Sequence, residues 1–195
     1  MQVTGVILAG GRSARMGADK AFLAVGREVM IERVAGEIKK ICAEVLVAGG
    51  SFETGLRLGL KVIPDRIAGC GPIGGIHAAL HAARYELTLV VACDMPFITR
   101  KLAVILIDRA EGYDVAVPRH GDYLEPLFAV YRKTCLPAIE ESLKASRCKV
   151  TDFYPRVRVN YLAEEEWRAA VDLDKVFFNV NTPHDLNRAR KMLKK

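Results

Sequence analysis

Residues 4–20 read TGVILAGGRSARMGADK, and this stretch decides the fold class. Val6-Ile7-Leu8 is an apolar run with two β-branched residues, which predicts a buried strand. The run leads into Gly10-Gly11, where a backbone without Cβ atoms can turn sharply and expose its N–H groups. Three cations follow, namely Arg12, Arg15 and Lys20. A strand, a glycine turn and a cluster of cations together predict a loop that binds phosphate.

Two widespread phosphate-binding patterns do not fit this loop. In the Walker pattern a lysine follows a glycine directly, whereas Ala18-Asp19 separate Gly17 from Lys20. The Rossmann pattern spaces its glycines, whereas Gly10 and Gly11 are adjacent. A plain strand-ending turn with solvated cations is the alternative interpretation. Cations interleaved with glycines directly after a buried strand favour phosphate binding.

Strand and helix patterns alternate along the first half of the chain. Further apolar runs predict buried strands at residues 44–48 (EVLVA), 60–63 (LKVI) and 87–93 (LTLVVAC). Apolar residues at helical spacing predict a helix over residues 28–41. Strands connected by helices are typical of a three-layer α/β fold, with a mostly parallel central sheet and helices on both faces.

The second half of the chain shows shorter patterns and no linker. Strands are expected at residues 114–117, 127–131 and 157–159, with a loop at 118–125. Helices are expected after Thr99, over residues 133–145 and 163–168, and after the cap Thr182. The 195 residues contain no repeat or low-complexity segment, so we expect a single domain.

Asp94 directly follows the most strand-like run of the chain, residues 87–93. An acidic side chain at the carboxyl end of a central parallel strand lies where open α/β sheets bind their ligands. Mg²⁺ prefers oxygen ligands and is commonly held by one or two carboxylates and by substrate phosphates. Asp94 is therefore a candidate magnesium ligand. The alternative role is a cap for the next helix, although Thr99 is better placed for that.

Two other segments allow both a structural and a functional interpretation. The glycine-rich residues 68–75 (AGCGPIGG) either need tight turns or line a nucleotide pocket. Asn179 and Asn181 alternate with apolar neighbours, so both side chains point to one side of the segment. They either form local hydrogen bonds around a turn or face the active cleft.

The composition of the chain indicates which cellular compartment and which binding partners to expect. The hydrophobic fraction of 51% predicts a packed core. The net charge of +6 is dispersed except at the C-terminus, which lacks the aromatic residues typical of nucleic-acid binding. The five cysteines form no C-x-x-C motif and indicate a reducing environment. With no signal-peptide pattern or bilayer-length apolar run, we expect a cytoplasmic protein without membrane or nucleic-acid partners.

Six motifs along the chain carry a family resemblance: LAGGRSARMGADK, VIPD, GPIGGI, CDMPF, EPLFAVY and FNVNTPHDL. Through them almost the whole chain resembles the molybdenum cofactor guanylyltransferases. The resemblance implies a Rossmann-like nucleotidyltransferase fold. It also implies an enzyme that transfers GMP from GTP to the terminal phosphate of molybdenum-molybdopterin, releasing pyrophosphate. Mg²⁺ is the implied cofactor, and the guanine dinucleotide form of the molybdenum cofactor is the implied product.

The resemblance and the chemistry of the side chains together assign roles to residues. The expected nucleotide contacts are Leu8, Ala9, Gly10, Gly11, Lys20, Asp65 and Asp94. Arg15 and Lys20 are expected to hold the leaving pyrophosphate and the triphosphate, and Asp94 completes this catalytic set. Asn179 and Asn181 are expected near the acceptor or its phosphates. Residues up to about 110 would bind the nucleotide, and residues 111–195 the acceptor.

Several substrate alternatives stay open. Many relatives have a polar residue such as Asn where this chain has Gly49-Gly50, so a base or ribose contact there is missing or supplied by backbone. Related cytidylyltransferases tend to read LAAG, so Gly11 favours GTP only through one absent methyl group. The alternatives are a cytidylyltransferase of the same pathway, a guanylyltransferase for another small phosphate, and a non-catalytic GTP-binding adaptor. Transient contacts with molybdopterin-handling proteins or apo-molybdoenzymes are a further expectation.

Overall fold

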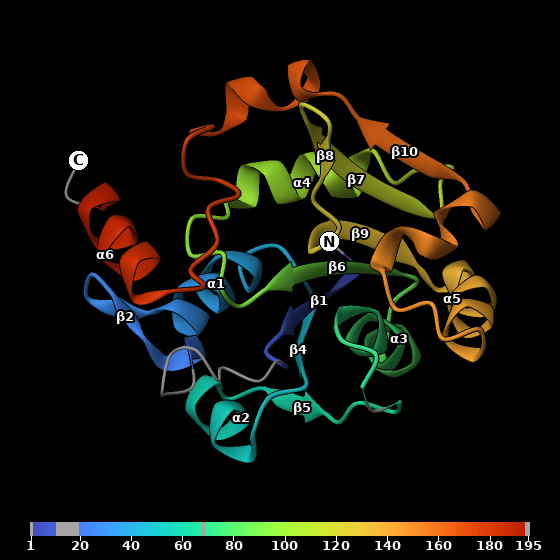
Figure 1. Ribbon diagram of the computed structural model, residues 1–195, viewed down its shortest axis with the longest axis horizontal. Helices are drawn as coiled ribbons and strands as arrows, with labels where there is room; N and C mark the ends of the chain where they lie inside the picture. Colours follow the sequence, from blue (N-terminus) through green and yellow to red (C-terminus); the bar gives the residue numbers. More distant parts are fainter. Residues whose placement is uncertain (1, 11–19, 68, 194–195) are drawn as a thin grey trace.

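A mixed sheet of eight strands forms the middle layer of the protein (Figure 1). The computed structural model describes residues 2–10, 20–67 and 69–193. The strand order is β5-β4-β1-β6-β9-β7-β10, with β8 paired to β7. Strands β5, β4, β1 and β6 are parallel, whereas β9 is antiparallel to both of its neighbours, β6 and β7. The strands are β1 Val3–Leu8, β4 Glu44–Ala48, β5 Lys61–Ile63, β6 Leu87–Ala92, β7 Val115–His120, β8 Tyr123–Leu124, β9 Phe128–Arg132 and β10 Val159–Leu162.

Helices cover both faces of this sheet, as the sequence predicts. Helices α1 and α4 pack on one face, and α3 and α5 pack on the other. The helices are α1 Met30–Ile38, α2 Phe52–Leu58, α3 Pro72–Ala82, α4 Arg100–Asp108, α5 Leu136–Lys144 and α6 Pro183–Met192. Short 3-10 helices span Lys20–Phe22, Lys133–Cys135, Val150–Arg156, Glu164–Glu166 and Arg168–Ala170. The three-layer α/β prediction is confirmed. None of the described helices is long and apolar enough to span a lipid bilayer.

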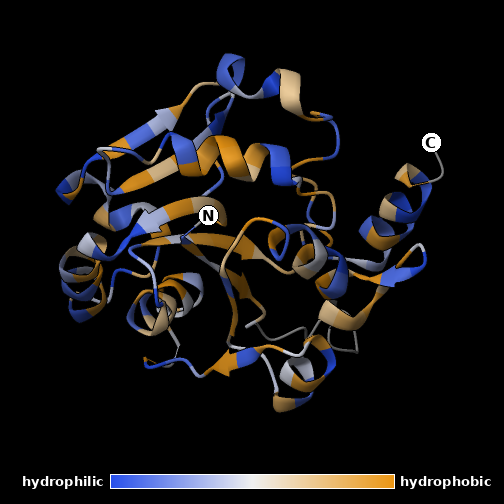
Figure 2. Cartoon of the chain, turned by 180° about the vertical axis from the view of Figure 1, so that it is seen from behind, coloured by the Kyte–Doolittle hydropathy of each residue, from blue (hydrophilic) through white to orange (hydrophobic). Residues whose placement is uncertain are grey.

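The central strands are buried on both faces, which explains why they read as continuous apolar runs. In β1 the side chains alternate between two cores: Ile7 packs in the α1/α4 core, whereas Val6 and Leu8 pack in the α3/α5 core. Figure 2 shows hydrophobic residues along most of the central strands, whereas the outer helices mix hydrophobic and hydrophilic residues. The buried sheet therefore holds the loops that follow its strands in fixed positions.

Two predicted helix caps are confirmed. Thr99 caps α4 by accepting a hydrogen bond from the Leu102 N–H group at 3.3 Å. Thr182 caps α6 in the same way, and the Asp185 carboxylate accepts a return bond from the Thr182 N–H group at 2.9 Å. This reciprocal capping box fixes where the chain turns from residues 179–181 into the last helix.

Some predicted boundaries are wrong. The helix expected over residues 28–41 is shorter, because Glu28–Val29 forms a strand (β3) that pairs with β2, Ala24–Val25. The loop expected at 118–125 is partly strand, since β7 continues to His120 and pairs with β8. The helix expected at 163–168 is replaced by two 3-10 turns.

Asp114 lies directly before β7 and joins three segments of the chain through hydrogen bonds. Its carboxylate accepts hydrogen bonds from the Thr134 hydroxyl at 2.6 Å and from the Arg158 N–H group at 2.9 Å. Burial opposes ionisation of this carboxyl, but the bonds from Thr134 and Arg158 outweigh it and lower its pKa. The side chain is only 12% exposed, so these bonds are shielded from solvent.

We expect Asp114→Asn to lower the free energy of unfolding by about 1–3 kcal/mol near neutral pH, because bonds to a charged acceptor are lost. A carboxyl with a lowered native pKa stabilises the fold above its unfolded-state pKa of about 4 and loses this effect as the pH falls. The difference between wild type and variant should therefore shrink below about pH 4. Urea unfolding across this pH range measures it, with Asp122→Asn as an exposed control. A pH-independent difference would contradict the prediction.

Candidate functional site

A cavity of about 600 Å³ opens at the carboxyl ends of the parallel strands. Its walls come from the ends of β1, β4 and β6, the loop after β5, the start of α3 and the residue before β9. The lining residues are Leu8, Gly10, Ala48, Asp65, Gly69, Gly71, Pro72, Gly75, Ala92, Cys93, Asp94 and Leu127. This position matches the general rule for ligand sites in open α/β sheets.

Backbone hydrogen bonds continue past the strand ends and hold the cavity floor together. The Ala9 N–H group donates to the Ala48 carbonyl at 2.9 Å, and the Cys93 N–H group donates to the Leu8 carbonyl at 3.1 Å. Gly49 donates in the same way to the carbonyl of Ile63 at 3.1 Å. The loops that leave the four parallel strands therefore start from fixed positions.

Gly10 and Gly49 form a close backbone contact at one wall of the cavity. Gly49 has φ of +75°, and a Cβ atom added there would lie 2.8 Å from the Cα atom of Gly10. Only glycine fits this contact, because other residues disfavour that φ and carry a Cβ atom. The same Cβ position is 3.7 Å from Oδ1 of Asp65. Glycine is thus required at position 49 by packing.

The second glycine-rich segment brings the start of α3 to the cavity. Gly69, Gly71, Pro72 and Gly75 all line it, which agrees with the functional interpretation of residues 68–75. Gly71 precedes the helix with φ of +59° and supplies no side-chain cap. Gly75 lets the helix approach β1, since a Cβ atom there would lie 3.0 Å from Leu8. The positive end of the α3 dipole therefore lies at the cavity wall, which favours anions.

Two carboxylates border this cavity. Asp94 follows β6 and is partly buried, whereas Asp65 follows β5 and is exposed. The alternative role of Asp94 as a helix cap is excluded, because Thr99 caps α4. Carboxylate oxygens are the ligands that Mg²⁺ prefers, so these two residues are candidate ligands at the cavity.

The asparagine segment meets the strand end that carries Asp94. The Val180 N–H group donates to the Asp94 carbonyl at 2.9 Å, which fixes residues 179–181 beside this edge of the sheet. The side-chain amide of Asn179 donates locally to the Phe177 carbonyl at 3.1 Å. Asn181 is exposed, and its backbone N–H group bonds Asp185 at 3.2 Å. The structure thus contains part of the local hydrogen bonding that the structural interpretation of the two asparagines predicts. The segment also lies beside Asp94, which lines the cavity.

Three predicted site residues lie within or directly after residues 11–19, which the structure does not describe. Gly11 and Arg15 lie outside the described residues. Lys20 begins the 3-10 helix Lys20–Phe22, which follows that segment, and its side chain is not described. Ala9 is not among the cavity-lining residues, although its backbone supports Ala48.

Leu127 lines the cavity and has no predicted role from the sequence. It lies in the EPLFAVY motif, just before β9 begins at Phe128. Burial raises the pKa of the Glu125 carboxyl in the same motif. The only sequence indication for Leu127 was the EPLFAVY motif. This motif contributes to the family resemblance, but the resemblance assigns no role to it.

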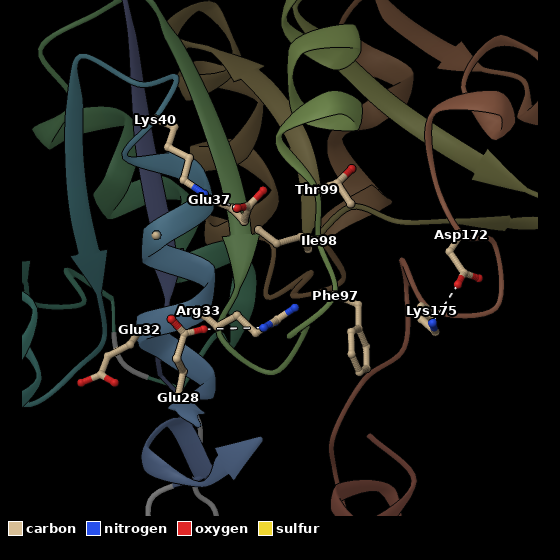
Figure 3. A pocket seen from close by; sticks show the side chains of 11 residues that line it. Glu28, Glu32, Arg33, Glu37, Lys40, Phe97, Ile98, Thr99, Asp172 and Lys175 are labelled. Atoms are coloured by element: carbon tan, nitrogen blue, oxygen red, sulfur yellow. Dashed lines mark hydrogen bonds and ion pairs between the residues drawn. The ribbon is translucent and has the colours of Figure 1, made fainter. Parts of the chain in front are cut away.

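A second cavity, of about 430 Å³, lies between α1, residues 97–99 and residues 172–175 (Figure 3). Its charged side chains form pairs: Arg33 with Glu28 at 3.6 Å, Lys40 with Glu37 at 2.6 Å, and Lys175 with Asp172 at 3.0 Å. Since its cations are already neutralised by neighbouring carboxylates, this cavity is a poor phosphate site. The cavity at the strand ends is the better candidate.

Comparison with known proteins defines the class. The fold is that of a nucleotidyltransferase, and the sequence model of the MobA-like NTP transferase domain matches residues 5–157. A cytidylyltransferase for 2-C-methyl-D-erythritol 4-phosphate from Thermus thermophilus shares this fold, with a TM-score of 0.70 over 97% of this chain and 98% of that chain, at 20% identity. The predicted enzyme class is confirmed.

Two closer relatives define the family. A probable molybdenum cofactor guanylyltransferase of Pelotomaculum thermopropionicum is 64% identical over 98% of this chain and 94% of its own length. The crystal structure of molybdopterin-guanine dinucleotide biosynthesis protein A from Archaeoglobus fulgidus has a TM-score of 0.85, at 29% identity over 98% of both chains. The chain therefore belongs to the molybdenum cofactor guanylyltransferases within the MobA-like NTP transferases, which confirms the resemblance found in the sequence.

Proposed function

We propose that this protein transfers GMP from GTP to the terminal phosphate of molybdenum-molybdopterin, giving the guanine dinucleotide form of the cofactor. Its family supports this activity. The observation that carries the proposal is the single cavity that unites Gly10, Asp65 and Asp94 with the start of α3. A glycine loop, a helix N-terminus and carboxylates in one cavity suit a nucleoside triphosphate with its metal ion.

The transfer replaces one P–O bond by another. An oxygen of the acceptor phosphate bonds to the α-phosphorus of GTP, and the bond to the β-phosphate oxygen breaks, so pyrophosphate leaves. The acceptor phosphate is already ionised near neutral pH, and no general base is required. The protein must align the two phosphates and neutralise their charge.

We assign the contacts with the phosphates, the metal ion and the nucleotide to four side chains and to the glycine loop. Backbone N–H groups of Gly10 and Gly11 hold phosphate oxygens, Lys20 contacts the triphosphate, and Arg15 holds the leaving pyrophosphate. Asp94 binds Mg²⁺, and the nearby Asp65 contacts the nucleotide; their oxygens in one cavity fit this hard cation. Bound Mg²⁺ would supply positive charge to the triphosphate and the leaving group.

The acceptor is proposed to bind beside Asp94, on the side of the C-terminal half. Residues up to about 110 then hold the nucleotide, and residues 111–195 contribute the acceptor contacts, including Asn179 and Asn181. The hydrogen bond from Val180 to the Asp94 carbonyl supports this division, because it brings the asparagine segment against the backbone of a cavity-lining residue.

The partners and the compartment follow from this reaction. The five cysteines are free thiols, which favours a reducing compartment, and we propose the cytoplasm. Molybdenum-molybdopterin must be received from one protein and its dinucleotide form passed to another. Transient contacts with molybdopterin-handling proteins and apo-molybdoenzymes are therefore part of the proposal.

Nucleotide-dependent release of pyrophosphate tests the proposed function. The purified protein is given molybdenum-loaded molybdopterin and Mg²⁺ with GTP, CTP, ATP or UTP in separate reactions. We expect release with GTP only, because Gly11 leaves room for a purine edge. Release with CTP would contradict the base assignment and favour a cytidylyltransferase. Binding of GTP without any release would favour a non-catalytic adaptor or a different acceptor phosphate.

A further inference from the structure

Three potential metal ligands meet between α3 and α5, which lie side by side in Figure 1. His77 and His81 are one helical turn apart on α3 and therefore project from the same side of it. Glu140 reaches them from α5. One donor atom from each of the three side chains lies within 4.8 Å of the other two. None of the three residues lines the nucleotide cavity.

The spacing of the donor atoms fits a tetrahedral metal ion. The two Nε2 atoms are 3.2 Å apart, and Oε1 of Glu140 lies 3.5 Å from His77 and 3.3 Å from His81. Zinc bonds of about 2.0–2.2 Å place neighbouring ligands of a tetrahedron about 3.3–3.6 Å apart. The three atoms thus correspond to three corners, and the partly exposed side of His81 leaves the fourth corner open to water.

The His77 ring is well placed to act as a neutral ligand. It is only 5% exposed, and its Nδ1 atom has no hydrogen-bond partner among the described residues. Its Nε2 atom faces Nε2 of His81 and Oε1 of Glu140, so the tautomer that is protonated at Nδ1 would direct the Nε2 lone pair toward a metal ion between these atoms. Two imidazole nitrogens at 3.2 Å share at most one hydrogen bond, whereas a cation between them binds both lone pairs.

We propose that His77, His81 and Glu140 form a site for a divalent transition-metal ion, for which Zn²⁺ is the best fit. Two imidazoles and one carboxylate suit Zn²⁺, whereas Mg²⁺ prefers oxygen ligands alone. A bound ion would join α3, which starts at the nucleotide cavity, to α5 in the C-terminal half. This site is separate from the proposed catalytic Mg²⁺ site, and its existence does not depend on the proposed reaction.

Titration of the full-length protein with Co²⁺ tests the site, because tetrahedral Co²⁺ has a characteristic visible absorption. With Mg²⁺ in excess, we expect one saturable site per chain, from which Zn²⁺ displaces Co²⁺. Loss of an outer-shell partner costs about 10- to 100-fold in metal affinity, and loss of a direct ligand should cost at least as much. His81→Gln and Glu140→Gln should therefore each weaken binding by at least about tenfold. His184→Gln changes an exposed histidine on α6 and should leave binding unchanged.

Thermal unfolding gives an independent measurement. Zn²⁺ at about a hundredfold excess over its Kd should raise the wild-type Tm by about 5–10 °C. The rise should be preserved in His184→Gln and lost in the two ligand variants, whose melting without metal verifies their folding. Equal Co²⁺ spectra and equal Tm shifts in wild type and both ligand variants, or no saturable binding at all, would overturn the proposal.

Discussion

Asp94→Ala should lower the rate of pyrophosphate release with GTP by at least about a thousandfold while GTP still binds. The carboxylate borders the cavity at the end of β6, where it is proposed to hold the metal ion. Charge on the leaving pyrophosphate develops during the reaction, so a metal ligand stabilises the transition state more than the bound nucleotide. The measurement pairs a steady-state release assay with calorimetric titration of GTP.

Asp122→Ala is the matched control for this variant. Asp122 is a highly exposed carboxylate on the turn between β7 and β8, and it does not line the cavity at the strand ends. Its loss should leave the GTP affinity and the release rate at saturating acceptor unchanged. If Asp94→Ala retained most of the activity, or if GTP binding and turnover fell in parallel, Asp94 would not have the proposed catalytic role.

Gly49→Ala should cost about 2–5 kcal/mol of stability and also raise the KM for GTP. The added Cβ atom would lie 2.8 Å from Cα and 3.0 Å from N of Gly10, and neither backbone atom can yield as a flexible side chain would. The positive φ of +75° adds a conformational cost for alanine. Displacement of Gly10 would move the phosphate loop, so both Tm and KM should change.

Gly59→Ala measures the conformational cost of a positive φ alone, without the steric clash that is expected in Gly49→Ala. Gly59 also has a positive φ, +61°, at the end of α2, but a Cβ atom there meets nothing within 4 Å. This variant should lose only about 1 kcal/mol and keep the wild-type KM. Equal effects of the two substitutions on KM would show that the contact between Gly10 and Gly49 is not important for nucleotide binding.

Most of the fold was predictable because its central strands are buried on both faces. The strand at Glu44–Ala48 was predicted with its observed bounds, and Thr99 and Thr182 were predicted as caps from their own chemistry. Helix α2 was not predicted. Its Gly55 lowers helix propensity, yet it is needed there because a Cβ atom would lie 2.6 Å from Val62 of β5. A requirement set by tertiary contact is not visible in local sequence.

The candidate site likewise combines features that local sequence predicts with features that depend on tertiary packing. Gly10, Asp65 and Asp94 each follow a predicted strand, so parallel pairing was enough to expect them at one edge of the sheet. Leu127 was not expected there, because its position depends on β9 running in the opposite direction. His77 and His81 were visible at i, i+4 spacing, but only the packing of α5 against α3 adds Glu140. Side-chain positions around Arg15 and Lys20 stay predictions.

The reversed strand β9 has a consequence for how this enzyme family can diversify. Because β9 is antiparallel, its amino end lies at the same edge as the carboxyl ends of β6 and β7, and the β7–β8 turn is at that edge too. The exposed residues of this turn can change in length and sequence without altering the buried strands beneath. We expect evolution to adjust acceptor choice through this hairpin while the glycine loop after β1, which is proposed to bind the triphosphate, stays constant.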